Sequence, residues 1–147
     1  MNESIEYLNL NKYKPLLLIQ TYSLLTLVRL GLLLLPFKTL KGLLIKLSKY
    51  RGDQKSSITA KNIARAIARS SRLSPGTVKC LAKALTTNTL MNIYNLPCQL
   101  RIGVAKSQDK GLEAHAWVEA EGKIVVGYLP DLARYQTMTS QQQGLLL

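Results

Sequence analysis

Residues 98–126 have the sequence CQLRIGVAKSQDKGLEAHAWVEAEGKIVV, and this stretch contains the change of periodicity that decides the fold. Apolar residues occupy every second position from Cys98 to Val104, which is the pattern of a strand with one buried face. Polar, glycine-containing turns at 107–111 and 121–122 divide the stretch. The sequence therefore predicts a meander of three antiparallel strands, at 98–106, 112–120 and 123–126.

Before residue 98 the apolar residues recur at helical spacing instead. Helical segments are predicted at 15–37, 38–49, 58–72 and 78–91. Ser56 or Ser57 is expected to cap the third of them, and Thr77 the fourth. Helices followed by an antiparallel meander define the α+β class, with N-terminal helices packed on a small antiparallel sheet. We divide the chain into a leucine-rich helical region at 1–55, a core at 56–138 and a tail at 139–147.

The leucine-rich segment Pro15–Phe37 is long enough to cross a bilayer. Arg29 lies well inside it, and an arginine at mid-bilayer depth costs about 2.5–3.5 kcal/mol. Gln20 interrupts the other half, and Pro36 ends the segment before a basic stretch begins. We therefore expect a helix buried against other protein, while the basic stretch leaves contact with a membrane surface open.

The composition is that of a globular chain with a strong positive charge. Of the 147 residues, 47% are hydrophobic, which is enough for one packed core. Lysine and arginine number 20 against 8 acidic residues, and the net charge of +12 attracts anionic peptides, nucleic acids or membranes. Two cysteines make no disulfide framework, and the first residues lack the order of a secretory signal. We therefore expect a reducing, cytoplasmic location.

The two cysteines stand in different contexts. Cys98 lies on the apolar side of its predicted strand, which is the setting of a buried and unreactive thiol. Cys80 lies in the first turn of a predicted helix, directly after a Ser-Pro-Gly turn. The partial positive charge of a helix N-terminus favours a thiolate, and its N–H groups bind an oxyanion. Cys80 is therefore the candidate nucleophile, although a small buried helix residue also fits its position.

His115, the only histidine, lies on the strand predicted at 112–120. By strand alternation it shares a face with Trp117 and Glu119. A single histidine on a strand also fits a purely structural role. We expect the helix that starts near Cys80 to pack on the sheet and the imidazole to point at its tip, which makes a Cys–His pair.

Several motifs of this region occur together in one known family. They are CL at the start of the candidate nucleophile helix, LRIGV in the first strand, AHAWVE before a glycine turn, and VRLGLLLLPF upstream. Through these motifs residues 22–135 resemble the lasso-peptide leader peptidases, the microcin-processing branch of the transglutaminase-like superfamily. The resemblance implies a papain/transglutaminase-like fold for the core at 56–138 and the activity of a cysteine peptidase.

The resemblance also implies roles for individual residues. Cys80 would attack the peptide bond between leader and core in a ribosomally made precursor. His115 would take the thiol proton and pass it to the leaving amine. Some members of the family carry an aspartate where this chain has Gly127. Asp131 is then the candidate third residue and Glu119 the alternative; without either, a Cys–His dyad remains.

The same resemblance implies partners. A chain this short resembles the split form of the enzyme, which acts with a separate leader-recognition protein and passes its product to a lasso cyclase. Whether the pathway depends on ATP stays open. The basic stripe of Lys61, Arg65 and Arg69, together with Trp117, is a candidate contact to the leader or the partner, although such a stripe also fits a solvated helix face. The apolar surface expected around Leu16–Leu35 is a second docking face.

Three other interpretations use the same residues. A zinc site at Cys80, Cys98 and His115 lacks the paired spacing of structural zinc ligands, so no metal is expected. A non-catalytic binder of peptide, membrane or nucleic acid would rely on the net charge. The strands place Trp117 among acidic residues, so no nucleic-acid partner is expected. An acyltransferase on the same core would pass the thioester to an amine instead of water.

Overall fold

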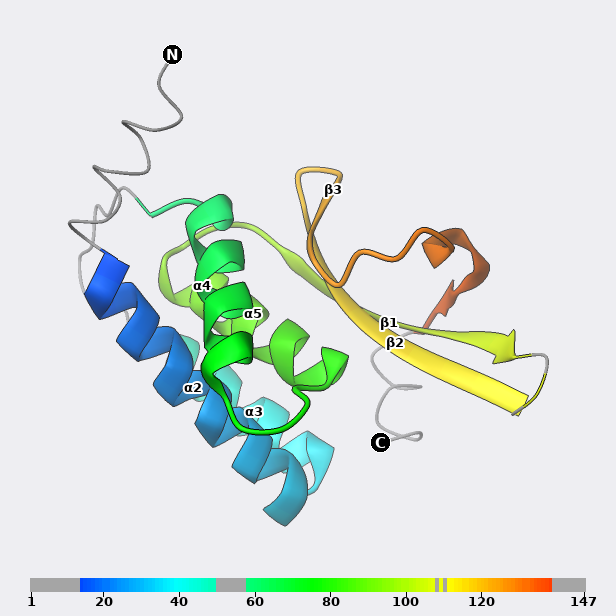
Figure 1. Ribbon diagram of the computed structural model, residues 1–147, viewed down its shortest axis with the longest axis horizontal. Helices are drawn as coiled ribbons and strands as arrows, with labels where there is room; N and C mark the ends of the chain where they lie inside the picture. The colour runs from blue at the N-terminus through cyan, green and yellow to red at the C-terminus, as the bar shows by residue number, and fades with distance from the viewer. Residues whose placement is uncertain (1–13, 50–57, 108, 110, 139–147) are drawn as a thin grey trace.

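The computed structural model describes residues 14–49, 58–107, 109 and 111–138. Within them, four helices precede a four-stranded antiparallel sheet, which confirms the predicted α+β class. Figure 1 shows the helices gathered on one side, while the long β1–β2 hairpin reaches away from them. The predicted tail at 139–147 lies outside the described residues, as do Ser56 and Ser57. The prediction that one of these serines caps the next helix is wrong, because Thr59 is its N-cap.

The first two helices are separated where proline interrupts the sequence. α2 (Lys14–Leu34) ends before Pro36 and α3 (Phe37–Lys49) begins directly after it. Proline disfavours a helical conformation in the residue before it, whereas its fixed φ suits the start of a helix. The two helices touch at Gly31, where an added Cβ would lie 2.6 Å from Leu40 Cδ1 of α3.

The next two helices begin at different kinds of N-cap. α4 (Ala60–Leu73) is capped by Thr59, whose hydroxyl accepts a hydrogen bond from the backbone N–H three residues on. α5 (Cys80–Ile93) has Lys79 at its N-cap and no side-chain cap. The prediction that Thr77 caps this helix is wrong, because the residue after it is drawn into the core in the linking loop, and the helix begins only at Cys80.

The predicted strands are all present, as β1 (Gln99–Ser107), β2 (Gly111–Ala120) and β3 (Lys123–Val126). Glu121 and Gly122 both have positive φ, as a tight turn between β2 and β3 requires. A further strand that the sequence did not predict, β4 (Gln136–Thr137), pairs with β1. The strand order is therefore β3-β2-β1-β4, and the chain must cross from one edge of the sheet to the other.

The crossing segment runs over the face of the sheet that is turned away from the helices. It includes a short 3-10 turn at Leu132–Arg134. Gly127 passes so close to β2 that an added Cβ would lie 2.7 Å from both the carbonyl oxygen of Ala116 and Cβ of Trp117. Its φ of +94° is also one that glycine alone adopts readily. The crossing therefore depends on a glycine at position 127.

The core lies between the helices and the other face of the sheet. Ile102, Ala116 and Val118 are 4%, 2% and 0% exposed, and they form one cluster with buried residues of all four helices. Both the predicted N-terminal region and the predicted catalytic core contribute to this cluster. The predicted boundary between them falls in a segment outside the described residues and stays a prediction.

Candidate active site

Cys80 is the first residue of α5. The backbone N–H groups of a first helical turn have no partner within the helix. No acidic residue and no side-chain cap occurs there, so nothing within that turn offsets the positive end of the helix dipole near the thiol. Cys80 is a free, partly buried cysteine that packs against the core cluster. This environment fits the predicted role of nucleophile.

His115 is held on the outer face of the sheet by three neighbours. Its Nε2 lies 2.7 Å from the carbonyl oxygen of Gly127. Its ring centroid is 6.1 Å from that of Trp117, nearly parallel to it, and 5.7 Å from that of Tyr135. A carbonyl oxygen can only accept, so Nε2 carries the hydrogen and the neutral ring keeps its lone pair on Nδ1. Gly127 thereby selects the tautomer in which Nδ1 can act as a base.

The imidazole does not point at the tip of α5, contrary to our expectation. α5 packs on the face of β2 that carries Ala116 and Val118, and strand alternation places His115 on the opposite face. The small and branched apolar side chains fit against the helix, whereas the large ring of Trp117 occupies the other side with His115. No hydrogen bond joins the Cys80 thiol to the imidazole in this structure.

One edge of β2 has no strand partner beside His115. β3 pairs with β2 only from Val118 to Ala120, and the chain leaves the sheet at Gly127. β1 covers the opposite edge of β2 from Gly111 to Glu119. Beside His115 this edge of β2 therefore has no strand partner, and the chain at Gly127 passes next to Ala116 and Trp117 there.

Asp131, the predicted third residue, is engaged elsewhere. Its Oδ2 lies 2.9 Å from Nη2 of Arg134, and its side chain is 53% exposed. The same Arg134 nitrogen lies 3.1 Å from Glu113 on β2, so this ion-paired group ties the crossing segment to the hairpin. Among the residues that the structure describes, the hydrogen-bond partner of His115 is the Gly127 carbonyl and no carboxylate.

Glu119, the alternative third residue, supports the neighbour of His115 instead. Its Oε1 accepts a hydrogen bond from Trp117 Nε1 at 2.8 Å, and its Oε2 lies 3.5 Å from Nε of Arg101. Trp117 is 3% exposed and covers Gly103, where an added Cβ would lie 2.9 Å from the indole. Trp117 therefore packs this face of the sheet, and the predicted contact between it and a substrate would require the ring to be uncovered.

Two groups around the imidazole were not identified from the sequence. Gly127 contributes a backbone carbonyl, and a backbone carbonyl cannot be recognised from the residue type. The available signal was a glycine directly after a strand, which indicates an unusual backbone conformation. Tyr135 comes from the segment before β4, and its hydroxyl donates to Glu113 Oε2 at 3.2 Å. Burial and the neighbouring Glu113 raise the pKa of Tyr135, so the phenol stays protonated.

Because Glu113 is ion-paired, we expect the folded protein to lose stability in acid. Hydrogen bonds from Ser107 and Arg134 lower the pKa of Glu113 below its usual value of 4.5. A carboxylate with a lowered pKa stabilises the folded state above its unfolded pKa, and this contribution is lost as the pH falls through the folded value. In urea unfolding between about pH 5 and pH 2, the wild type should therefore lose more stability than Glu113→Gln. Equal losses in the two proteins would contradict the pairing.

The second cysteine has the environment of a structural thiol. Cys98 Sγ lies 3.2 Å from Oδ1 of Asn88 on α5, and burial raises the pKa of Cys98. A raised pKa keeps a thiol protonated near neutral pH, and the protonated form is a poor nucleophile. The contrast with Cys80, at an uncapped helix start, favours Cys80 as the reactive one.

Cys98→Ala is expected to lower the free energy of unfolding by about 1 kcal/mol, because a small, half-buried side chain is truncated. Any cleavage activity should stay at the wild-type level. Urea unfolding and a cleavage time course on the same preparation measure both quantities. An inactive but folded Cys98→Ala protein would reverse the assignment of the two cysteines.

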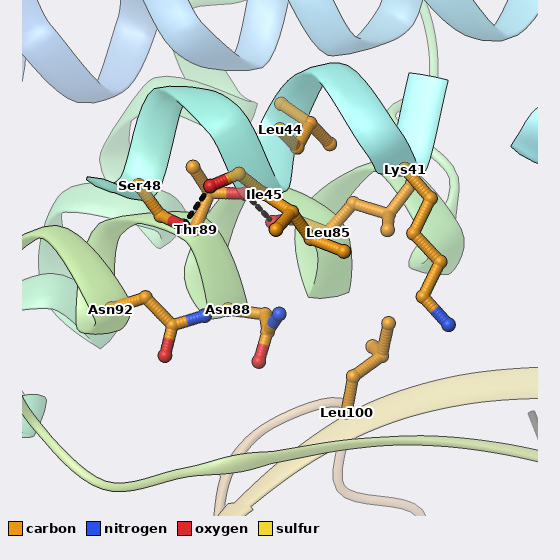
Figure 2. A pocket seen from close by; sticks show the side chains of 9 residues that line it. All are labelled: Lys41, Leu44, Ile45, Ser48, Leu85, Asn88, Thr89, Asn92 and Leu100. Atoms are coloured by element: carbon orange, nitrogen blue, oxygen red, sulfur yellow. Dashed lines mark hydrogen bonds between the residues drawn. The ribbon is translucent and has the colours of Figure 1, made fainter. Parts of the chain in front are cut away.

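A cavity of about 130 Å³ lies between α3, α5 and β1, and neither Cys80 nor His115 lines it. Figure 2 shows Asn88 and Asn92 on α5 facing the gap above Leu100 of β1. In the described part of the chain, no three His, Cys, Asp or Glu side chains gather as metal ligands. The interpretation of Cys80, Cys98 and His115 as a zinc site therefore receives no support from their positions.

The predicted basic stripe lies on α4. Lys61 and Arg69 are exposed there, and Arg65 is partly buried. The helix has no acidic residue in its first turn and ends with Arg72 in its last turn. A contact from this face to a leader peptide or a partner protein stays a prediction.

Helices packed on a small antiparallel sheet, with a cysteine at a helix start and a histidine on a strand, form the framework of cysteine-dependent hydrolases and acyltransferases. A family model described as the transglutaminase-like superfamily matches residues 24–140. The chain therefore belongs to the transglutaminase-like superfamily, which generally contains cysteine-dependent enzymes. No curated protein and no solved structure matches it.

Proposed function

We propose that this protein is a cysteine peptidase that removes the leader from a ribosomally synthesised lasso precursor peptide. The observation that carries the proposal is the hydrogen bond from His115 Nε2 to the Gly127 carbonyl, which leaves Nδ1 of the only histidine able to accept a proton. The motifs CL, LRIGV and AHAWVE support the leader peptidases in particular within the superfamily. Cys80 at the start of α5 supplies the thiol.

In the proposed mechanism, His115 Nδ1 accepts the proton of the Cys80 thiol, and the thiolate attacks the carbonyl carbon of the leader–core bond. The N–H groups of the first turn of α5 stabilise the oxyanion of the tetrahedral intermediate. The amine of the core peptide leaves with the proton from the imidazolium. Water then hydrolyses the thioester that holds the leader. The Gly127 carbonyl stabilises the imidazolium and keeps the ring oriented.

This mechanism requires the thiol and Nδ1 to come within hydrogen-bond reach, about 2.6–3.2 Å between the heavy atoms, when the substrate is bound. We place this approach at the edge of β2 that has no strand partner beyond the end of β3. Binding of an extended peptide there would bring its scissile bond between the α5 tip and the imidazole. Asp131 has no part in this arrangement, so the site works as a dyad oriented by a backbone carbonyl.

Mass spectrometry of a candidate precursor, encoded nearby and incubated with this protein and its leader-recognition protein, tests the proposal. The wild type should cut at one position and give two products whose masses sum to the precursor plus one water. A leader fragment that carries an added amine would identify an acyltransferase instead. No cleavage, with the precursor bound intact, would favour a non-catalytic binding role.

The proposal also assigns the partners and the location. A separate leader-recognition protein presents the precursor, and a lasso cyclase receives the freed core peptide. The cytoplasm suits a mechanism that needs a reduced thiol. Adding ATP to the cleavage assay, with and without the partner proteins, shows whether the proteolytic step itself depends on nucleotide.

A further inference from the structure

One face of α2 carries six exposed apolar residues. Its exposed leucines and isoleucine, each with 49–82% of the residue accessible, are Leu16, Ile19, Leu27, Leu30, Leu33 and Leu34. A helix of 21 residues is about 30 Å long, and Figure 1 shows α2 at the outer border of the helical half, on the side away from the sheet. Exposed Ser23 and Thr26 lie between Ile19 and Leu27, so the exposed apolar residues form two groups on this face, Leu16 with Ile19 and Leu27 to Leu34. Groups of this size exceed the scattered leucines of an ordinary surface and indicate a binding partner.

The opposite face of α2 is fixed in the core. Leu25 and Val28 are 0% exposed and Leu24 is 6% exposed, and the helix packs on α4 and α5. By length and composition alone, residues 16–34 would also be able to cross a membrane. Crossing would pull these buried residues out of the core and place Arg29 near the bilayer centre. Contact along one side of the helix is therefore the geometry that leaves the fold intact.

The charged residues of α2 and α3 all have one sign. No aspartate or glutamate occurs between residues 14 and 49. Lys38, Lys46 and Lys49 are exposed on α3, which touches α2 where Gly31 meets Leu40. Protein–protein interfaces are enriched in aromatic residues and methionine, whereas the exposed apolar residues of α2 are leucine and isoleucine. Exposed leucines combined with lysines are typical of helices that lie on anionic membranes.

We propose that this apolar–basic face, made of the six exposed α2 residues and the exposed lysines of α3, docks on the surface of an anionic lipid bilayer. α2 lies in the plane of the interface with its leucines at the boundary between headgroups and acyl chains. The lysines of α3 contact the lipid phosphates. The docking does not depend on the proposed peptidase activity, because neither Cys80 nor His115 belongs to this face.

Co-sedimentation of the full chain with lipid vesicles tests the docking directly. Vesicles of equal parts phosphatidylcholine and phosphatidylglycerol should bind at least about tenfold more protein than phosphatidylcholine vesicles, and added salt should release it. Absence of binding to the anionic vesicles would overturn the proposal. So would binding of equal strength to both compositions, or binding that resists salt as a membrane-spanning helix does.

A pair of double variants tests the apolar part. Leu27→Gln with Leu34→Gln should weaken partition into anionic vesicles at least about tenfold, because two leucines leave the interface. Leu73→Gln with Leu112→Gln removes two leucines of similar exposure, 64% and 66%, from α4 and β2, and should bind like the wild type. Equal binding by both double variants, each with the wild-type circular dichroism spectrum, would contradict the proposal.

A second pair tests the charges. Lys38→Gln with Lys46→Gln should weaken partition by about fivefold for each lysine, whereas Lys61→Gln with Arg69→Gln changes the net charge equally on α4 and should have a smaller effect. If the face instead binds a second copy of the chain, sedimentation velocity without lipid will show a dimer that Leu27→Gln with Leu34→Gln disperses. That result would replace the membrane by a protein partner.

Discussion

Replacing Cys80 with alanine is expected to reduce precursor cleavage by at least about 10³-fold, because the remaining thiol cannot substitute for it. The Cys98 thiol contacts Asn88, and burial raises its pKa. Cys98 also lies outside the uncapped first turn of α5, where Cys80 is placed. The fold should survive, since the substitution removes one atom from a partly buried side chain. A mass-spectrometric time course with the precursor and its leader-recognition protein measures the effect, and circular dichroism checks the fold.

Replacing His115 tests the second residue of the proposed Cys–His dyad. His115→Ala should lose as much activity as Cys80→Ala, and the double variant should be no worse than either, because residues that act as one unit are not additive. Cys98→Ala is the matched control, with one thiol removed and activity kept. A Cys80→Ala protein that still cleaves the precursor at the wild-type position would refute the proposed mechanism.

Replacing Gly127 with alanine should lower the free energy of unfolding by about 3 kcal/mol or more. The φ of +94° costs an alanine about 1–2 kcal/mol on its own. The new Cβ would also lie 2.7 Å from the Ala116 carbonyl oxygen and from Trp117 Cβ, so the crossing segment must move away from β2. Because that segment carries the carbonyl that orients His115, cleavage should fall as well. Urea unfolding measures the loss of stability.

Gly122 provides a control that also has a positive φ but no crowding. Its φ is +75°, and an added Cβ would have no atom within 4 Å. Gly122→Ala should therefore cost only about 1–2 kcal/mol and leave cleavage unchanged. If the two alanine variants were equally stable, the close approach of residue 127 to β2 would not exist in solution, and the proposed orientation of the imidazole would lose its support.

The parts of the fold that sequence could predict are those that depend on neighbours in the chain. The two-residue period of 98–126 identified β1, β2 and β3, because side chains of a strand alternate between its faces whatever lies beyond them. Pro36 separated α2 from α3 because its ring fixes the backbone φ and removes a backbone N–H, whatever the rest of the fold is. The position of Cys80 at a helix start followed likewise from the turn before it.

The arrangement around His115 depended on residues far away in the chain. β4 contains two residues, too few for a pattern, and it forms only because β1 offers a free edge. The direction of the imidazole was misjudged because alternation shows which residues share a face but not which face the helices will cover. Its acceptor is a main-chain carbonyl, and the two acids expected in that role pair with Arg134 and with Trp117 instead.

The sequence by itself therefore determined the α+β class and the helix and strand segments, and it named Cys80 and His115 as the candidates for the chemistry of a cysteine-dependent enzyme. Each of these follows from local periodicity, turn residues or side-chain type. Only the tertiary structure decided that Gly127 holds His115, that Trp117 is buried, and that one face of α2 stays uncovered. These depend on which surfaces meet when distant segments pack, and a surface becomes buried or exposed only through that packing.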